Sequence, residues 1–301
     1  MFGTVFQLTP NGDGTWTRTM IHDFAGPPSD GEDSMAGMVF DAAGNLYGET
    51  CLGGTANAGT VFELIPQSDG TWAEKILYSF QNGIDGGCPA GPLTFDGAGN
   101  NLYGTTAGGG NTACSAGCGT VFELQRSANW KESVLYAFTG GADGATPFAG
   151  VTWAQPDTLY GTTYLGGSGG SGTVFQLTFA GGAWSESVIH NFTPDDAVEG
   201  LAPTSGLVLD GSDLYGTTTG GGKAGLRTGL RGIAFKLSFA GGQWTEQVLH
   251  RFHGPPTDGD HPASGVALRR DSTGLHIFGT AFYGGPSTCG LGCGAVYEIT
   301  E

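Results

Sequence analysis

The sequence predicts an all-β protein, a single five-bladed β-propeller built from four-stranded antiparallel blades. Three observations predict it: an excess of glycine, a repeat of about 60 residues, and strand motifs that recur within each repeat. Of the 301 residues, 58 are Gly, which is more than twice the usual level of about 7%. Because glycine weakens helices and supplies the positive φ of tight turns, this composition favours short strands joined by turns. Aromatic residues make up 11% of the chain, which is enough to fill a core.

The first recurring motif, here named strand C, is Gly-Thr-Val-Phe. It begins at Gly3, Gly59, Gly119 and Gly172, and recurs in altered form at Gly232 and Gly294. A second motif, strand D, contains a Trp and, eight residues later, a Phe, as in Trp72 and Phe80. Since side chains alternate along a strand, the even offset predicts that both aromatic rings lie on one face.

Two shorter motifs complete the unit. Strand A has the pattern Gly-Leu-x-Phe-Asp, which appears as Gly-Met-Val-Phe-Asp in residues 37–41. Strand B reads Asn-Leu-Tyr-Gly-Thr-Thr, as in residues 101–106. The turn between them often contains Gly-Asn, a hairpin signal. Four short strands in each unit are typical of a propeller blade, whereas a parallel β-helix would use much shorter coils.

The predicted units cover the chain as a single domain, residues 1–301. They span about 3–58, 59–118, 119–171, 172–231 and 232–293, with a closing strand at 294–301. We expect the N- and C-terminal strands to pair and close the ring. Strand C occurs six times and the other strands five, so one copy is surplus: it adds an outer strand, displaces the last copy, or indicates a fragment of a longer propeller.

The strand motifs carry a resemblance to a known family. Gly-Thr-Val-Phe-Glu-Leu at residues 59–64 and Asn-Leu-Tyr-Gly-Thr-Thr at residues 101–106 resemble the bacterial extracellular tandem repeats called GloVer repeats. The resemblance covers nearly the whole chain. It implies a secreted or surface-attached bacterial propeller and transfers no catalytic residue.

Charge and hydropathy exclude several classes of function. The formal net charge of −17 would repel a phosphate backbone, so we expect no nucleic-acid partner. No apolar run approaches the roughly 20 residues that span a bilayer. No signal peptide is visible, and the chain enters a repeat almost at once, so we expect a trimmed or incomplete reading frame. We also expect a monomer.

The six cysteines predict local disulfides. Cys114 and Cys118 form one closely spaced pair, Cys289 and Cys293 form another, and Cys51 and Cys88 could link neighbouring repeats. Zinc is less favoured, because the two closely spaced pairs lie in different repeats. Disulfides indicate an oxidising compartment, so we expect an extracellular or cell-surface protein.

The loops between strands B and C and between strands D and A are predicted to share one face of the propeller. Each D–A loop contains an acid followed by Gly; the five acids are Asp30, Asp85, Asp143, Glu199 and Asp258. One interpretation is a turn in which each carboxylate accepts local backbone N–H groups. The other is a ring of carboxylates that binds a metal ion, in particular Ca²⁺.

Departures from the repeat supply the remaining candidate residues. Glu49 replaces a threonine, and Asp260 and His261 replace small residues of most other units. If the chain is an enzyme, we expect carbohydrate-active, glycoside hydrolase-like acid–base chemistry by carboxylates. The candidate catalytic residues are Glu49, Glu199, Asp258 and Asp260, and the candidate ligand-binding residues are His261, Tyr164, Phe282 and Tyr283.

These observations predict an exported bacterial propeller that binds, and could hydrolyse, a polysaccharide at the face of the B–C and D–A loops. The alternative is a non-enzymatic surface or scaffold protein that mediates adhesion or protein interaction.

Overall fold

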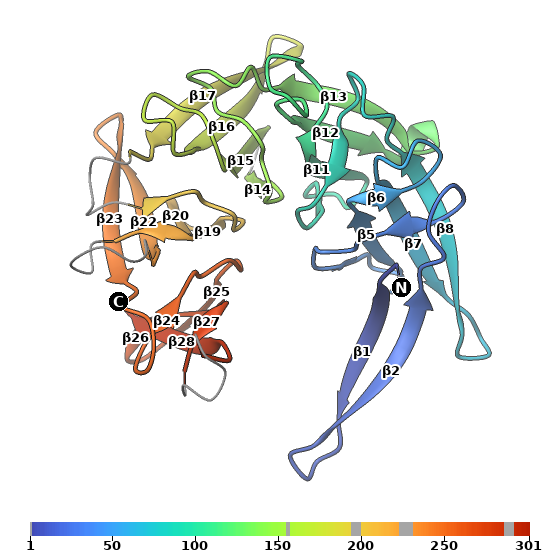
Figure 1. Cartoon of the computed structure of the whole chain (residues 1–301), viewed down its shortest axis with the longest axis horizontal. Helices are drawn as coiled ribbons and strands as arrows, with labels where there is room; N and C mark the ends of the chain where they lie inside the picture. The colour runs from blue at the N-terminus through green and yellow to red at the C-terminus, as the bar shows by residue number, and fades with distance from the viewer. Residues whose placement is uncertain (1, 155–156, 194–199, 223–230, 286–291) are drawn as a thin grey trace.

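The chain folds as five propeller blades arranged around an open arc, preceded by a two-stranded hairpin (Figure 1). The computed structural model describes residues 2–154, 157–193, 200–222, 231–285 and 292–301. Within these ranges the regular structure is β-strand, apart from one short 3₁₀-helix, η1 (Arg126–Ala128). The prediction of an all-β, five-bladed propeller is therefore confirmed.

Each of the first four blades is an antiparallel sheet with strands in the order A-B-C-D, and the fifth has the order A-B-C. The hairpin consists of β1 (Thr4–Pro10) and β2 (Trp16–Asp23). The first blade contains β4 (Val39–Phe40), β5 (Leu46–Thr50), β7 (Thr60–Pro66) and β8 (Trp72–Ser79). The second contains β10 (Thr94–Phe95), β11 (Asn101–Gly108), β12 (Thr120–Gln125) and β13 (Lys131–Ala137).

The third and fourth blades repeat this order, and the fifth has no strand D among the described residues. The third contains β14 (Thr152–Ala154), β15 (Thr158–Thr163), β16 (Thr173–Ala180) and β17 (Ala183–Asn191). The fourth contains β19 (Val208–Asp210), β20 (Asp213–Thr218), β22 (Ile233–Ala240) and β23 (Gln243–Arg251). The fifth has three strands, β25 (Ala267–Asp271), β26 (Gly274–Ala281) and β28 (Ala295–Thr300).

Neighbouring sheets pack through one recurring aromatic contact. The Phe that follows strand D lies edge-on against the aromatic residue of strand C in the next sheet, with ring centroids 4.9 to 5.5 Å apart. The five pairs are Phe24–Phe62, Phe80–Phe122, Phe138–Phe175, Phe192–Phe235 and Phe252–Tyr297. The hydrophobic core is thus a series of similar layers between blades.

The prediction that the Trp and Phe of strand D share one face is wrong. Trp72 packs in the layer shared with the preceding sheet, whereas Phe80 packs in the layer shared with the following blade. The cause is a β-bulge: the register between β7 and β8 shifts between Val61 and Phe62. The extra residue in strand D reverses the alternation of side chains. The same shift occurs in the other C–D pairs.

The predicted pairing of the terminal strands is also wrong. Among the described residues, β1 pairs only with β2 and β28 pairs only with β26, and the two end sheets stand apart in Figure 1. The surplus copy of strand C explains this: β1 already occupies the C position beside β2 over seven residue pairs. Strand D of the hairpin is therefore not free to complete the fifth blade.

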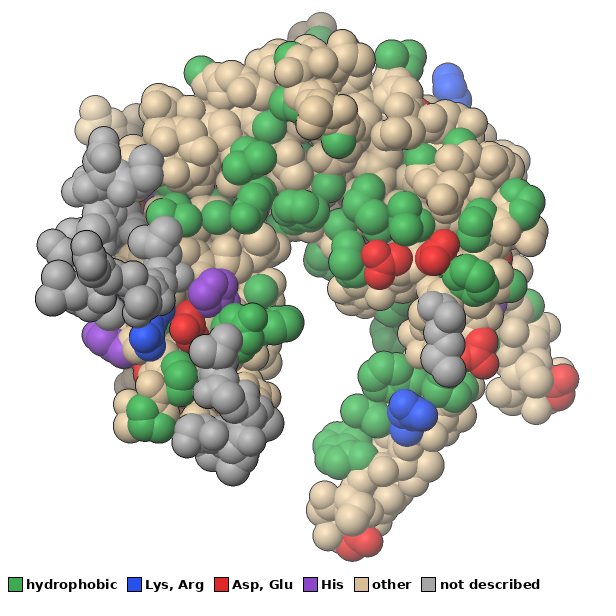
Figure 2. Space-filling view, in the orientation of Figure 1, with side chains coloured by type: hydrophobic (Ala, Val, Ile, Leu, Met, Phe, Trp, Pro, Cys, Tyr) green, Lys and Arg blue, Asp and Glu red, His purple; other side chains and the backbone are tan. Residues whose placement is uncertain are grey.

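The open ends expose apolar side chains that are buried elsewhere in the molecule. Phe6 and Leu8 of β1 are 49% and 50% exposed, whereas their counterparts in β7, Phe62 and Leu64, are fully buried. Figure 2 shows apolar side chains along this hairpin. The hairpin lacks the preceding sheet that would cover this face.

The disulfide predictions are confirmed where the structure describes both partners. Cys51 is bonded to Cys88, which links two successive loops, and Cys114 is bonded to Cys118. Cys293 is also disulfide-bonded, and its predicted partner Cys289 lies outside the described residues. No helix among the described residues is both long enough and apolar enough to cross a membrane.

Candidate functional site

The B–C and D–A loops meet on one face, as predicted, because short antiparallel ladders join them. The ladders pair β3 (Gly31–Glu32) with β6 (Leu52–Gly53), β18 (Gly200–Leu201) with β21 (Gly220–Gly221), and β24 (Gly259–Asp260) with β27 (Tyr283–Gly284). In the second unit β9 (Gly87–Pro89) pairs with β11, and in the third Ala145 bridges to Leu165.

One residue in each D–A loop connects consecutive B–C loops. It lies three positions after the recurring acid and has a left-handed φ of 52° to 63°, although none of the five is Gly. These residues are Asp33, Cys88, Thr146, Ala202 and His261. Its N–H donates to the residue before strand C of the preceding sheet, as from His261 to the Arg231 carbonyl at 3.1 Å. The face is therefore a continuous hydrogen-bonded surface.

The recurring acids hold the backbone of their own loops. Asp85 accepts hydrogen bonds from the Gln81 and Gly83 N–H groups at 2.8 and 3.1 Å, and Asp30 accepts one from the Ala25 N–H at 2.6 Å. The Tyr136 hydroxyl and the Thr139 N–H both donate to Asp143. Glu199 lies outside the described residues. Such contacts correspond to the interpretation of each acid as a local turn residue.

The structure brings four of the predicted site residues together at the fifth blade. Asp260 and Tyr283 face each other in the β24–β27 ladder, and the Asp260 carboxylate contacts His261 Nδ1 at 2.5 Å. The rings of His261 and Tyr283 are 5.5 Å apart, and those of Tyr283 and Phe282 are 4.9 Å apart. Phe282 is 69% exposed. We name Asp260, His261, Phe282 and Tyr283 the fifth-blade cluster.

The remaining predicted ligand-binding residue, Tyr164, lies elsewhere on this face. Its ring packs edge-on against Phe148 at 5.5 Å. Phe148 lines a cavity of about 450 Å³ whose wall also includes Leu165 and the Cys51–Cys88 disulfide. Tyr164 and Phe282 occupy equivalent positions after strand B, so the same repeat position borders both features.

The structure does not bring Glu49 to the fifth-blade cluster. Glu49 belongs to β5 of the first blade, is 1% exposed, and neither carboxyl oxygen has a hydrogen-bond partner. Burial raises its pKa well above the ordinary value. Its counterpart Thr105 donates instead to the Ala149 carbonyl at 2.8 Å. The Glu49 carboxyl is therefore expected to be buried in its neutral, protonated form.

Strand D contributes partly buried carboxyls that sequence reasoning missed. Burial, followed by the nearby charge of Asp85, raises the pKa of Glu132 to about 7. Burial, followed by the charge of Asp143, raises the pKa of Glu186 to about 7. Their position two residues after the strand D Trp recurs in the sequence and was the available signal. They lie between blades rather than in the loops.

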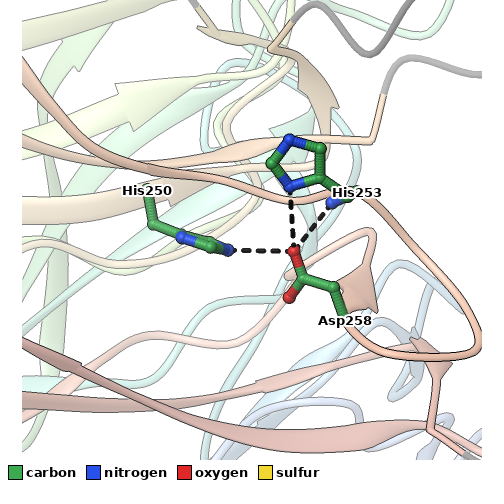
Figure 3. A group of neighbouring side chains, drawn as sticks. All are labelled: His250, His253 and Asp258. Carbon is green, nitrogen blue, oxygen red and sulfur yellow. Dashed lines mark hydrogen bonds and ion pairs between the residues drawn. The ribbon is translucent and has the colours of Figure 1, made fainter.

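A second group of polar side chains lies at the start of the last D–A loop (Figure 3). His250 Nε2 and His253 Nδ1 lie 3.0 and 3.3 Å from the same Asp258 oxygen, Oδ2, which also accepts the His253 N–H at 2.8 Å. Asp258 has a lowered pKa, because the hydrogen bonds from His253, His250 and Gly259 outweigh its partial burial. The contact between His253 and Asp258 was missed in the sequence, although His253 departs from its counterparts Ala25, Gln81 and Thr139.

The metal prediction named Asp30, Asp85, Asp143, Glu199 and Asp258 together. Among the described residues, two groups of potential ligands have their ligand atoms within 4.8 Å of one another: His250 with His253 and Asp258, and His22 with Asp30 and Glu74. Each group contains one of the recurring acids, and neither joins two of them.

The blades and their interlinked loops define the chain as a β-propeller with a loop face on the B–C and D–A side. A family model for the Gloeobacter/Verrucomicrobia repeat matches residues 2–229 and 112–301. The chain belongs to this repeat family. No curated protein matches it in sequence.

Solved structures share the fold at low identity. A crystal structure of an ancestral GH74 enzyme matches at 15% identity and a TM-score of 0.60, covering 99% of this chain and 38% of that one. This chain thus spans well under half of that protein. A periplasmic gluconolactonase of Pseudomonas aeruginosa matches at 13% identity and a TM-score of 0.54, covering 98% of this chain and 76% of that one.

Proposed function

We propose that the protein is an exported bacterial glycan-binding propeller whose ligand site is the fifth-blade cluster. The observation that carries the proposal is the grouping of Phe282, Tyr283, His261 and Asp260 on the loop face. An exposed aromatic ring gives the apolar face of a sugar a surface to pack on, and a carboxylate and an imidazole offer hydrogen bonds to hydroxyl groups. Such a combination is typical of a small-molecule recognition site.

Glycan binding is better supported than glycan hydrolysis. Glycoside hydrolysis usually needs two carboxyl groups about 5 to 9.5 Å apart across one bond. The candidate catalytic residues Glu49 and Asp260 lie in different blades, and Glu49 is buried. Hydrolysis remains a prediction, and reducing-sugar release that survives Glu49→Gln and Asp260→Asn would remove these residues from it.

Two further observations are compatible with this proposal. The disulfides among the described cysteines suit an oxidising compartment outside the cytosol. The printed names of two structural matches, a GH74 enzyme and a gluconolactonase, describe those proteins, and the likeness to them concerns the fold.

A glycan array of plant, fungal and bacterial polysaccharides tests the proposal. We expect the wild type to retain at least one glycan class, and Phe282→Thr to reduce the signal at least tenfold. Thr is the residue at the equivalent position of the fourth unit, Thr219, so the fold should tolerate it. Phe40→Thr is the matched control, because Phe40 is 64% exposed in strand A of the first blade.

Equal signals from wild type and Phe282→Thr would contradict the site assignment. Silence of a folded wild type across the array would favour the alternative, a non-enzymatic scaffold. The exposed apolar face of the N-terminal hairpin is the observation that favours that alternative.

A further inference from the structure

We propose that His250, His253 and Asp258 form a binding site for a divalent transition-metal ion of the Zn²⁺ and Ni²⁺ type. The three side chains converge from the end of β23 and from the loop that follows it (Figure 3). This inference is independent of the proposed glycan site.

The geometry is close to that of a metal site with two imidazoles and one carboxylate. Bonds of about 2.0 to 2.2 Å from a tetrahedral ion place its ligand atoms roughly 3.3 to 3.6 Å apart. His250 Nε2 and His253 Nδ1 lie 3.0 and 3.3 Å from Asp258 Oδ2, and all three ligand atoms lie within 4.8 Å of one another. Small adjustments of the side chains would therefore admit the ion.

The ligands are accessible from solvent. The His253 side chain is 64% exposed and that of His250 is 35% exposed, so an ion can enter from solvent. The Asp258 side chain is 19% exposed, and its Oδ2 atom faces both imidazoles. Arg231 donates a hydrogen bond to the His253 carbonyl, which fixes the backbone from which the ring projects.

Comparison of the repeat units distinguishes the contacts that hold the D–A loop from the additional imidazole of the last unit. In the second unit the Tyr78 hydroxyl and the Gln81 N–H donate to Asp85, so a tyrosine and a backbone amide are sufficient to hold the loop. The fifth-blade loop keeps the same backbone bond, from the His253 N–H to Asp258, at 2.8 Å. The second imidazole is therefore not required by the turn.

The chemistry of the ligands selects the class of ion. Imidazole nitrogens suit Zn²⁺, Ni²⁺ and Cu²⁺, whereas Ca²⁺ takes six to eight oxygen ligands. Three protein ligands leave at least one coordination position for water. The expected occupant therefore differs from the Ca²⁺ predicted for a ring of acids.

The test measures metal binding by the full chain, purified without a polyhistidine tag and stripped with a chelator. We expect calorimetry with Zn²⁺ or Ni²⁺ to show one site for each chain. Co²⁺ added to the same protein should give visible absorption bands of a nitrogen-ligated ion. No saturable binding by the wild type would overturn the proposal.

Variants borrowed from the chain itself keep the fold and remove the ligands. His253→Thr and His250→Tyr install the residues of the third unit, Thr139 and Tyr136, and each should weaken binding tenfold or more. His190→Tyr is the matched control, because His190 occupies the His250 position in β17 without the second imidazole. It should leave the affinity unchanged.

The reverse exchange tests sufficiency. The double variant Tyr136→His/Thr139→His places two imidazoles and one carboxylate around Asp143. In the wild type Asp143 accepts hydrogen bonds from the Tyr136 hydroxyl and the Thr139 N–H, as Asp85 does in its own loop. We expect this variant to bind two ions for each chain. Unchanged affinity in His253→Thr would contradict the assignment, and a variant that unfolds is replaced by His253→Gln, after the Gln81 of the second unit.

Discussion

Glu49 occupies a position that holds threonine in the other units, and the exchange leaves a carboxyl buried without hydrogen bonds. The carboxyl packs against the backbone of the next blade at Gly104. A Cβ at this position would lie 2.6 Å from Glu49 Oε1, so the absence of a side chain leaves room for the carboxyl. A buried carboxyl without partners has a raised pKa, because the charged form loses its hydration. This residue therefore carries a cost in stability that increases with pH.

We predict that Glu49→Thr stabilises the protein, and more at pH 8 than at pH 4. The folded protein keeps the Glu49 proton, while the unfolded chain releases it above its ordinary pKa of 4.5. The contribution of Glu49 to stability is thus full below that pH and is lost as pH rises, whereas threonine does not titrate and makes no such contribution. Thermal unfolding at both pH values measures the effect. A variant that is less stable than wild type at pH 8 would contradict it.

At the residue scale, comparison of the repeat units was the productive signal. The departures at Asp260 and His261, together with Phe282 and Tyr283, were found in the sequence, and the structure brings these residues together. The pairing of His253 with Asp258 was not predicted, because a five-residue loop separation does not reveal which side chains converge.

The blade-to-blade layers are the second scale, and the strand D bulge organises them. It turns the Trp of each strand D toward the preceding sheet and the following Phe toward the next. An alternation argument alone could not reveal this, because a single extra residue reverses the face of every later side chain.

Two tryptophans at the same repeat position differ in whether a preceding blade covers them. Trp130 is 6% exposed and contacts Tyr47 of the preceding blade, whereas Trp16 of the hairpin is 60% exposed. We expect Trp130→Ala to reduce the free energy of unfolding by about 3 to 5 kcal/mol, and Trp16→Ala to change it by less than about 1 kcal/mol. Denaturant titration measures both. Equal losses would show that the hairpin is covered like an inner blade.

The partly buried glutamates of strand D predict a pH dependence of these layers. Burial raises the pKa of Glu132 to about 7 from 4.5, so its contribution to stability is full below about pH 4.5 and is lost as pH rises through about 7. We expect Glu132→Gln to lose roughly 2 to 4 °C less in Tm than wild type between pH 5 and pH 8. Glu186→Gln should behave alike, and parallel pH curves for wild type and variants would refute this.

The whole molecule is an arc whose blades were predictable and whose ends were not. The recurring motifs predicted the number and order of strands, since each blade uses the same turns and the same core positions. Closure depends on which of two equivalent copies of strand C pairs with the N-terminal strand D. In the structure the local hairpin of β1 and β2 forms, because its strands are adjacent in the sequence.

One covalent link strengthens the arc between its first two blades. The Cys51–Cys88 disulfide closes a loop of 37 residues, and the Cys114–Cys118 disulfide closes one of four. Since stabilisation grows with loop length, we expect Cys51→Ser/Cys88→Ser to lose about 3 to 4 kcal/mol of unfolding free energy. The matched double variant Cys114→Ser/Cys118→Ser should lose less. A larger loss from the shorter loop would contradict the argument.

The central claim is that the shared repeat builds the scaffold while the departures of the last unit bind the glycan. Affinity electrophoresis in gels that contain soluble polysaccharides tests it most directly, with wild type beside the combined variant His261→Ala, Phe282→Thr and Tyr283→Gly. These are the residues of the fourth unit: Ala202, Thr219 and Gly220. We predict that a polysaccharide retards the wild type and that the variant, with an unchanged Tm, migrates as if no polysaccharide were present. Equal retardation of both proteins would contradict the claim.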